Sequence, residues 1–104
     1  MKPLLDLAGA SGALYRFRLT DPSELPVAGG NFVFVRQALE EAAVLACGTA
    51  ESLSEVAEHW GRAVLAEGAE WLYVRLNVAR AARSAEHEDL APVLGARIIA
   101  PERA

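Results

Sequence analysis

The segment ALYRFRL, residues 13–19, alternates apolar and basic side chains with a period of two. In an extended chain, Tyr15 and Phe17 fall on one side of this segment. Arg16 and Arg18 fall on the other side. Such alternation is typical of a β-strand with one buried and one exposed face. The segment therefore predicts a half-exposed strand, and the chain must fold around at least one sheet.

Three further apolar segments have the length of strands and are bounded by loop-forming or polar residues. They are NFVFVR (31–36), AVLAC (43–47) and AEWLYVRL (69–76). The first two are separated by a short polar stretch, which predicts a hairpin of antiparallel strands. ARIIA, residues 96–100, is expected to be a short terminal strand or a docked tail.

The period of the apolar residues changes after Gly48 and Thr49, which are predicted to form a turn. Ser52 and Glu55 fit a capping box at the start of a helix, and apolar residues follow at helical spacing. Gly68 is placed to end this helix as a left-handed residue. The sequence therefore predicts a helix between the second and third of these apolar segments.

A second helix is expected over residues 78–94, with Asn77 as its N-cap and Pro92 dividing its last part. The elements then follow the order β-β-β-α-β-α. We expect an α+β fold, with two helices on one face of a small, mainly antiparallel sheet of three to four strands. Residues 1–12 are expected to be a flexible lead-in, 13–100 a single domain and 101–104 a tail.

Composition limits the classes of protein that this chain resembles. Its 104 residues are 53% hydrophobic, which is enough for one core, and none of its apolar runs approaches the roughly 20 residues of a membrane span. The single cysteine excludes an internal disulfide framework and favours a cytoplasmic location. A net charge of −4 disfavours nucleic acid as a partner.

The basic residues leave two interpretations open. Nine of the ten are arginine, and a local strip of them can bind an anion even on an acidic protein. The candidates for such a strip, as a nucleic-acid site, are Arg16, Arg18, Arg75, Arg80 and Arg83. The alternative is that these arginines are solvated and paired with nearby glutamates.

Two other groups of residues could be functional sites but can also be explained as structural features. Cys47 and His59 are the one thiol and a histidine that can be paired as nucleophile and base, but a cysteine ending an apolar strand is typical of a core. His87 lies between Glu86 and Glu88, residue types that bind metals. Neighbouring residues of a helix point in different directions, so a solvated acidic face is the alternative here.

The layout of strand, hairpin, strand, glycine turn and helix resembles that of the GIY-YIG nucleases, over about residues 14–95. Gly30-Asn31-Phe32 resembles the first motif of that family, and Ala46-Cys47-Gly48 resembles the second. The family places a tyrosine in each motif, an arginine on the following helix and a metal-binding glutamate on a later helix.

The resemblance implies that the catalytic positions are substituted in this chain. Phe32 and Ala46 stand where the family has its tyrosines, and Val56 stands at the position of the arginine. His87 stands at the position of the glutamate. A phenylalanine or alanine cannot take a proton from water, and a valine cannot stabilise charge on a phosphate.

The expected function is therefore a non-catalytic GIY-YIG-like module for binding or assembly, without a cofactor. Its expected partner is another protein or a second copy of the chain. No interaction with a membrane is expected. The alternative is a nucleic-acid-binding protein or a divergent metal-dependent endonuclease. In that alternative, Mg²⁺ is held by Glu86 or Glu88.

Overall fold

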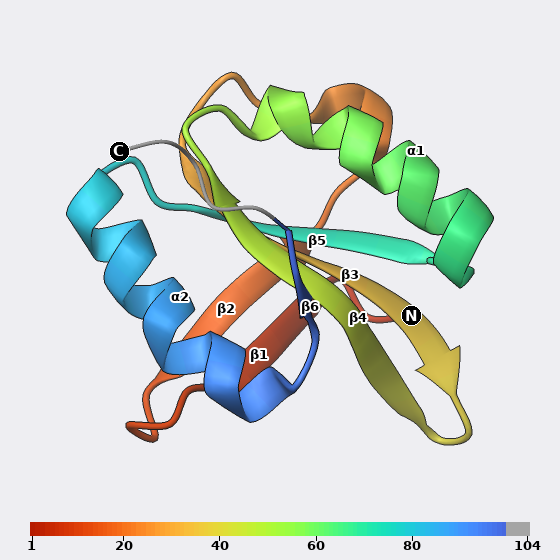
Figure 1. Cartoon of the computed structure of the whole chain (residues 1–104), viewed down its shortest axis with the longest axis horizontal. Helices are drawn as coiled ribbons and strands as arrows, with labels where there is room; N and C mark the ends of the chain where they lie inside the picture. The colour runs from red at the N-terminus through yellow and green to blue at the C-terminus, as the bar shows by residue number, and fades with distance from the viewer. Residues whose placement is uncertain (100–104) are drawn as a thin grey trace.

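The computed structural model describes residues 1–99, which form one sheet of six strands and two α-helices (Figure 1). The strands are β1 (Leu4–Ala8), β2 (Leu14–Leu19), β3 (Gly30–Ala38), β4 (Glu41–Ala50), β5 (Trp71–Leu76) and β6 (Arg97–Ile98). The helices are α1 (Val56–Glu67) and α2 (Arg80–Leu94), and two short 3-10 turns are η1 (Pro22–Glu24) and η2 (Leu53–Glu55). The predicted α+β class is confirmed.

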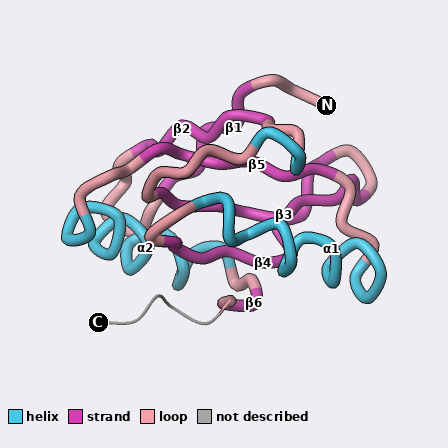
Figure 2. Tube along the Cα trace, turned by 90° about the horizontal axis from the view of Figure 1, so that it is seen from above, coloured by secondary structure: helices cyan, strands magenta, loops and turns pink. Residues whose placement is uncertain are grey.

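The sheet has the strand order β1-β2-β5-β3-β4-β6, which Figure 2 shows from top to bottom. All neighbours are antiparallel except β4 and β6, which are parallel. The predicted number of strands, three to four, was thus too low. The sheet is also mixed and not purely antiparallel. The two edge strands account for the difference: β1 was not predicted, whereas β6 is the short strand that was one of the two alternatives for residues 96–100.

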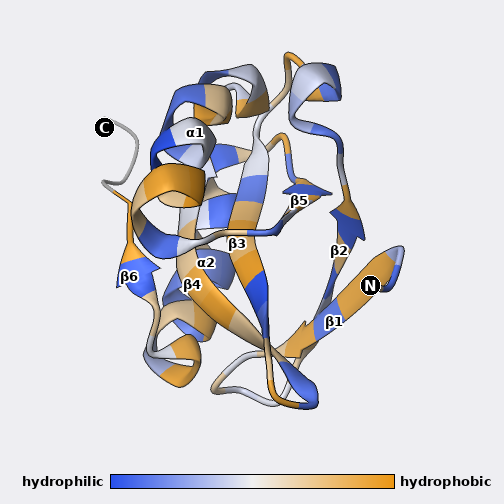
Figure 3. Cartoon of the chain, turned by 90° about the vertical axis from the view of Figure 1, so that its right-hand side faces the viewer, coloured by the Kyte–Doolittle hydropathy of each residue, from blue (hydrophilic) through white to orange (hydrophobic). Residues whose placement is uncertain are grey.

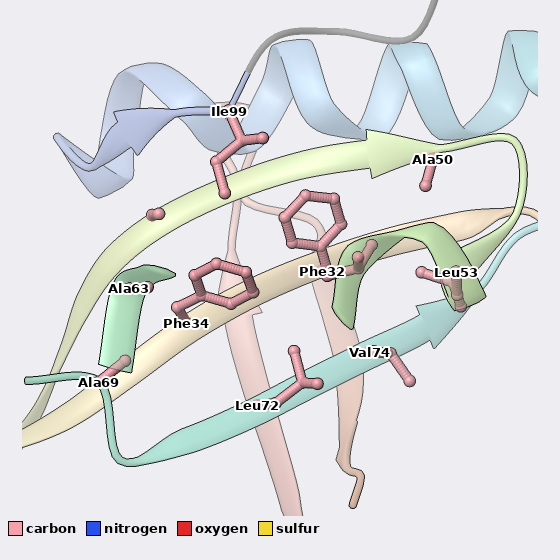
Figure 4. Close-up of a cluster of buried hydrophobic side chains, with 11 residues drawn as sticks. Phe32, Phe34, Ala50, Leu53, Ala63, Ala69, Leu72, Val74 and Ile99 are labelled. Carbon is pink, nitrogen blue, oxygen red and sulfur yellow. The ribbon is translucent and has the colours of Figure 1, made fainter. Parts of the chain in front are cut away.

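The two α-helices cover opposite faces of the sheet, which corrects the expectation that both lie on one face. Phe32 and Phe34 of β3 belong to the apolar cluster that contains residues of α1 (Figure 4). Val33 and Val35 belong to the cluster that contains residues of α2. Because successive strand residues point to opposite faces, this uninterrupted apolar run requires cover on both sides.

β4 does not end at Gly48 and Thr49, where a turn was predicted, but continues to Ala50. Gly48 pairs with Phe32 across the β3–β4 ladder and is buried. A side-chain carbon built at Gly48 would lie 2.6 Å from the Phe32 ring. The glycine therefore gives space to this ring inside a strand and does not mark a turn.

The start of α1 also differs from the prediction. The Ser52 hydroxyl contacts the Ser54 hydroxyl at 2.7 Å and makes no side-chain capping bond, so the capping box is wrong. η2 precedes the helix and buries Leu53 completely. At the other end, Gly68 adopts a left-handed φ of 70° and ends α1, as predicted.

β1 lies within residues 1–12, which were expected to form a flexible lead-in. Leu5 and Leu7 point into the apolar cluster on the α2 side, whereas Leu4 is more exposed. The alternation was hidden in the sequence because Leu4 and Ala8, two of the three outward positions of β1, are also apolar. Residues 100–104 lie outside the described part of the chain, as does the predicted tail 101–104.

α2 begins at Arg80 with Ala79 as its N-cap, so Asn77 is not the cap. The Asn77 amide instead donates to the buried side chain of Asn31 at 3.1 Å. Pro92 lies inside α2 and does not divide it. Neither α-helix within residues 1–99 has the length and apolar character needed to cross a bilayer.

Candidate functional site

The four positions that resemble the nuclease site do not form one surface. Phe32, Ala46 and Val56 are at most 2% exposed and pack in the apolar cluster under α1. His87 is half-buried on α2, which covers the opposite face, and burial holds its pKa below the ordinary value. Three of the positions are thus core residues, and the fourth is separated from them by the sheet.

The acidic residues beside His87 are also divided. The Glu86 carboxylate accepts a hydrogen bond of 2.6 Å from Nε of Arg75, whereas Glu88 is exposed. Within residues 1–99, no three His, Cys, Asp or Glu side chains lie close enough together to hold a metal ion.

Cys47 and His59 are not a nucleophile and a base in this arrangement. Cys47 is buried in the cluster on the α2 side, where burial raises the pKa of its thiol. His59 is exposed on α1, on the other side of the sheet. The thiol is part of the core.

The five arginines of the predicted basic strip do not lie together. Arg75 points to the α2 side, where it pairs with Glu86 and stacks on the Tyr15 ring at 5.6 Å. Arg83 is 3% exposed and donates to the Val78 carbonyl at 2.6 Å. Arg80 is exposed at the start of α2. Two of the five, Arg16 and Arg18, share a surface.

That surface is the part of the sheet that neither α-helix covers. The ladders place Arg18 directly between Leu4 of β1 and Val74 of β5. Val74 belongs to the cluster under α1, so Arg18 and its neighbours lie on the α1 side. β1 and β2 nevertheless lie away from α1, as Figure 3 shows with their alternating blue and orange bands. We name this surface the open face and define it by the exposed residues Leu4, Asp6, Leu14, Arg16, Arg18 and Leu76.

The open face carries three exposed leucines beside its charged residues. Leu14 is 69% exposed, Leu76 is 62% exposed and Leu4 is 37% exposed. A cavity of about 500 Å³ lies beside them, under the loop that connects β2 to β3. Its lining includes Arg18, Thr20, Glu24 and Pro26, together with Leu4 and Leu76 of the open face. This volume is within the usual range of ligand sites.

The cavity lies where β2 and β5 diverge. Thr20 donates to the Leu72 carbonyl, and the ladder between the strands then pairs Arg18 with Val74. In an antiparallel ladder the next hydrogen-bonded pair would be Arg16 with Leu76, but the ladder has ended there. The Arg16 carbonyl instead accepts from the Arg75 side chain at 3.4 Å.

The two arginines of the open face differ in their partners. Arg16 forms a bidentate pair with Asp6, with Nε–Oδ1 at 2.8 Å and Nη2–Oδ2 at 3.0 Å. This hydrogen bonding lowers the pKa of Asp6. The Arg18 side chain has no hydrogen-bond or ion-pair partner among the described residues, although the Arg18 carbonyl accepts a bond from the Thr20 hydroxyl. The open face therefore presents one unoccupied guanidinium between apolar side chains.

Sequence reasoning found part of this site. The alternation of residues 13–19 correctly places Arg16 and Arg18 on an exposed strand face. It missed Leu4, because β1 was not predicted, and Leu76, because its place on this surface depends on β5 lying next to β2. The signal that was available is the outward position of Leu14 in the same alternating segment.

Comparison of the chain with family models, with curated proteins and with solved structures gives no match.

Proposed function

We propose that this protein is a non-catalytic binding module and that the open face is its binding surface. The observation that supports this proposal best is the uncovered sheet surface itself, on which exposed Leu4 and Leu76 lie beside the Arg18 guanidinium, which has no partner within residues 1–99. Contiguous exposed apolar surface on a small domain marks sites of interaction. A mixture of apolar side chains and arginine is typical of protein interfaces.

The burial of three nuclease-like motif positions supports the non-catalytic part of this proposal. Phe32, Ala46 and Val56 fill the core under α1, and their side chains offer neither a proton acceptor nor a ligand for phosphate or metal. In this proposal the chain is a GIY-YIG-like scaffold that serves for contacts, and the family relationship is part of the proposal.

Site-specific photo-crosslinking tests the proposed function. A photoreactive residue is placed at Leu76 on the open face or, as the control, at Leu65 on α1, which is 90% exposed. We expect position 76 to give an adduct with one protein, identified by mass spectrometry and reproduced with the purified partner. Position 65 should not give that adduct. Equal labelling from both positions, or no specific adduct, would contradict the proposal.

Nucleic-acid binding is the second candidate, because Arg16 and Arg18 lie side by side on an exposed surface. Fluorescence anisotropy with single-stranded and duplex DNA at low salt tests it. Binding that weakens steeply as salt rises, and that is lost in Arg18→Gln, would support this candidate over a protein partner. Incubation of the same DNA with Mg²⁺ tests the divergent endonuclease, for which we expect no cleavage.

A further inference from the structure

We infer that the open face binds an extended protein segment that presents one acidic side chain and a neighbouring apolar side chain, with Arg18 pairing with the carboxylate. This inference rests on the proposed function and names the chemistry of its partner. Four features of the described residues support it: the partners of Arg16, the surroundings of Arg18, the local charge balance and the positions of Leu4 and Leu76 relative to Arg18.

The pair between Arg16 and Asp6 shows what this surface does with a carboxylate. Asp6 belongs to β1, an extended segment with apolar neighbours, and its carboxylate meets the guanidinium through two parallel hydrogen bonds. Arg18 is the next residue on the same side of β2, but its cross-strand neighbours are Leu4 and Val74. Within residues 1–99, the chain therefore supplies a paired carboxylate to Arg16 and no carboxylate within ion-pair distance of Arg18.

The surroundings of Arg18 favour a partner with an apolar side chain. Leu4 and Leu76 lie beside the arginine and line the same cavity of about 500 Å³. Docking an apolar side chain there would remove exposed leucine surface from water, which contributes roughly 25 cal/mol per Å² of apolar area. It would also reduce the access of water to the guanidinium, and a charge pair is stronger where water is excluded.

The charge of the surface argues against a polyanion. Asp6 and Glu24 lie close to Arg16 and Arg18, so acidic and basic groups balance on and beside the open face. A nucleic acid would bring several phosphates against these carboxylates. A segment with one carboxylate has a single site to occupy, at Arg18.

Leu4 and Leu76 lie on the two strands that flank β2, and their positions define the bound segment further. In an extended chain, residues i and i+2 lie on one side and about 6.6 Å apart. A segment with an acidic residue at one position and apolar residues two positions away can place the carboxylate at Arg18. The same segment can place leucine-sized side chains beside Leu4 and Leu76.

Amide chemical shifts of the full chain, titrated with capped peptides, test this inference. The probe is Leu-Thr-Asp-Thr-Leu, and the control peptide Leu-Thr-Asn-Thr-Leu lacks only the charge. We expect the acidic peptide to shift the amides of Arg18, Val74 and Leu76. The asparagine peptide should bind about tenfold more weakly. A hydrogen bond to a charged group is stronger than one to a neutral group, and the difference corresponds to roughly tenfold in affinity.

Two protein variants complete the experiment. Arg18→Gln removes the free guanidinium and should weaken the acidic peptide about tenfold, to the level of the asparagine peptide. Arg36→Gln is the matched control, since the Arg36 side chain is also exposed and has no hydrogen-bond or ion-pair partner within residues 1–99, but lies near the β3–β4 turn. Circular dichroism checks that both variants are folded.

The outcomes separate this inference from the proposed function. Equal binding to wild type and to Arg18→Gln overturns the inference, as does the absence of shifts on the open face at millimolar peptide. Competition by DNA, or a concentration-dependent dimer that buries the face, overturns it as well. If a specific crosslinked partner at Leu76 is nevertheless found, the proposed function stands. The inference that this partner binds through an extended acidic segment is then wrong. If both experiments fail, both proposals fall.

Discussion

At the scale of single residues, the fit between Gly48 and the Phe32 ring is one of the tightest constraints in the core. The ring lies over the backbone of Gly48, and both residues are buried. Replacing Gly48 with alanine puts a carbon 2.6 Å from that ring. We expect Gly48→Ala to lower the free energy of unfolding by about 1–3 kcal/mol, as overpacked core substitutions do. Urea denaturation measures this change.

Gly61 provides the matched control for this substitution. It lies in α1 and is exposed, and no atom lies within 4 Å of a side-chain carbon built there. Gly61→Ala should therefore raise the free energy of unfolding by about 0.5–1 kcal/mol, because alanine has the higher helix propensity. If Gly48→Ala is as well tolerated as Gly61→Ala, the Phe32 ring moves freely and the proposed tight fit is wrong.

At the scale of elements, the β1–β2 turn is tied to α2 through one carboxylate. Asp89 accepts hydrogen bonds from the Ser11 hydroxyl at 2.6 Å, the Ser11 N–H at 2.8 Å and the Tyr15 hydroxyl at 2.7 Å. The Asp89 carbonyl accepts a further bond from the Ala10 N–H. These contacts join the edge of the sheet to a helix far along the chain.

The same contacts predict a dependence of stability on acid pH. The bonds from Ser11 and then from Tyr15 lower the pKa of Asp89 below its ordinary 3.8. A carboxyl with a lowered folded pKa stabilises the protein above the unfolded pKa, and this contribution is lost as pH falls through the folded pKa. Asp89→Asn should therefore lower the melting temperature at pH 7 more than at pH 3.

Glu88→Gln is the control for this pH experiment, since the Glu88 side chain is exposed on the same helix and makes no hydrogen bond or ion pair among the described residues. Its melting temperature should follow that of the wild type at both pH values. A difference between Asp89→Asn and wild type that stays constant from pH 7 to pH 3 would show that the carboxylate charge is unimportant for this contact.

The elements also show which parts of the fold the sequence predicts. β2 and β5 follow from local patterns, because alternating or β-rich runs there agree with their burial. β1 was missed because Leu4 and Ala8, which point outward, are as apolar as the inward residues. Asn77 was wrongly predicted to be an N-cap, because asparagine is a common capping residue. In the structure its side-chain amide instead donates a hydrogen bond to the buried side-chain oxygen of Asn31.

At the scale of the whole molecule, the open face depends on pairings that no local pattern determines. β5 lies between β2 and β3, although about fifty residues of chain separate it from β2. This arrangement places Leu76 beside Arg16 and Arg18 and leaves Arg75 on the other side. The sequence predicted exposed arginines. Which leucines lie next to them, and that the Arg18 side chain has no partner within residues 1–99, could be seen only from the strand pairings.

This topology predicts unequal stability across the sheet. β3 pairs with β4 on one side and β5 on the other, whereas β1 pairs with β2 alone. The amides of Leu5 and Leu7 should therefore exchange through local opening of the edge, at a lower free energy than global unfolding. Those of Val33 and Phe34 should exchange through global unfolding.

Native-state hydrogen exchange by NMR measures these free energies in low concentrations of denaturant. Opening of the edge exposes little surface, so exchange of the β1 amides should depend weakly on denaturant, and that of the β3 amides strongly. Asp89→Asn should speed exchange in β1 and leave β3 less affected, because Asp89 holds the turn that follows β1. Equal free energies in β1 and β3 would instead mean that the edge, including the open face, unfolds together with the core.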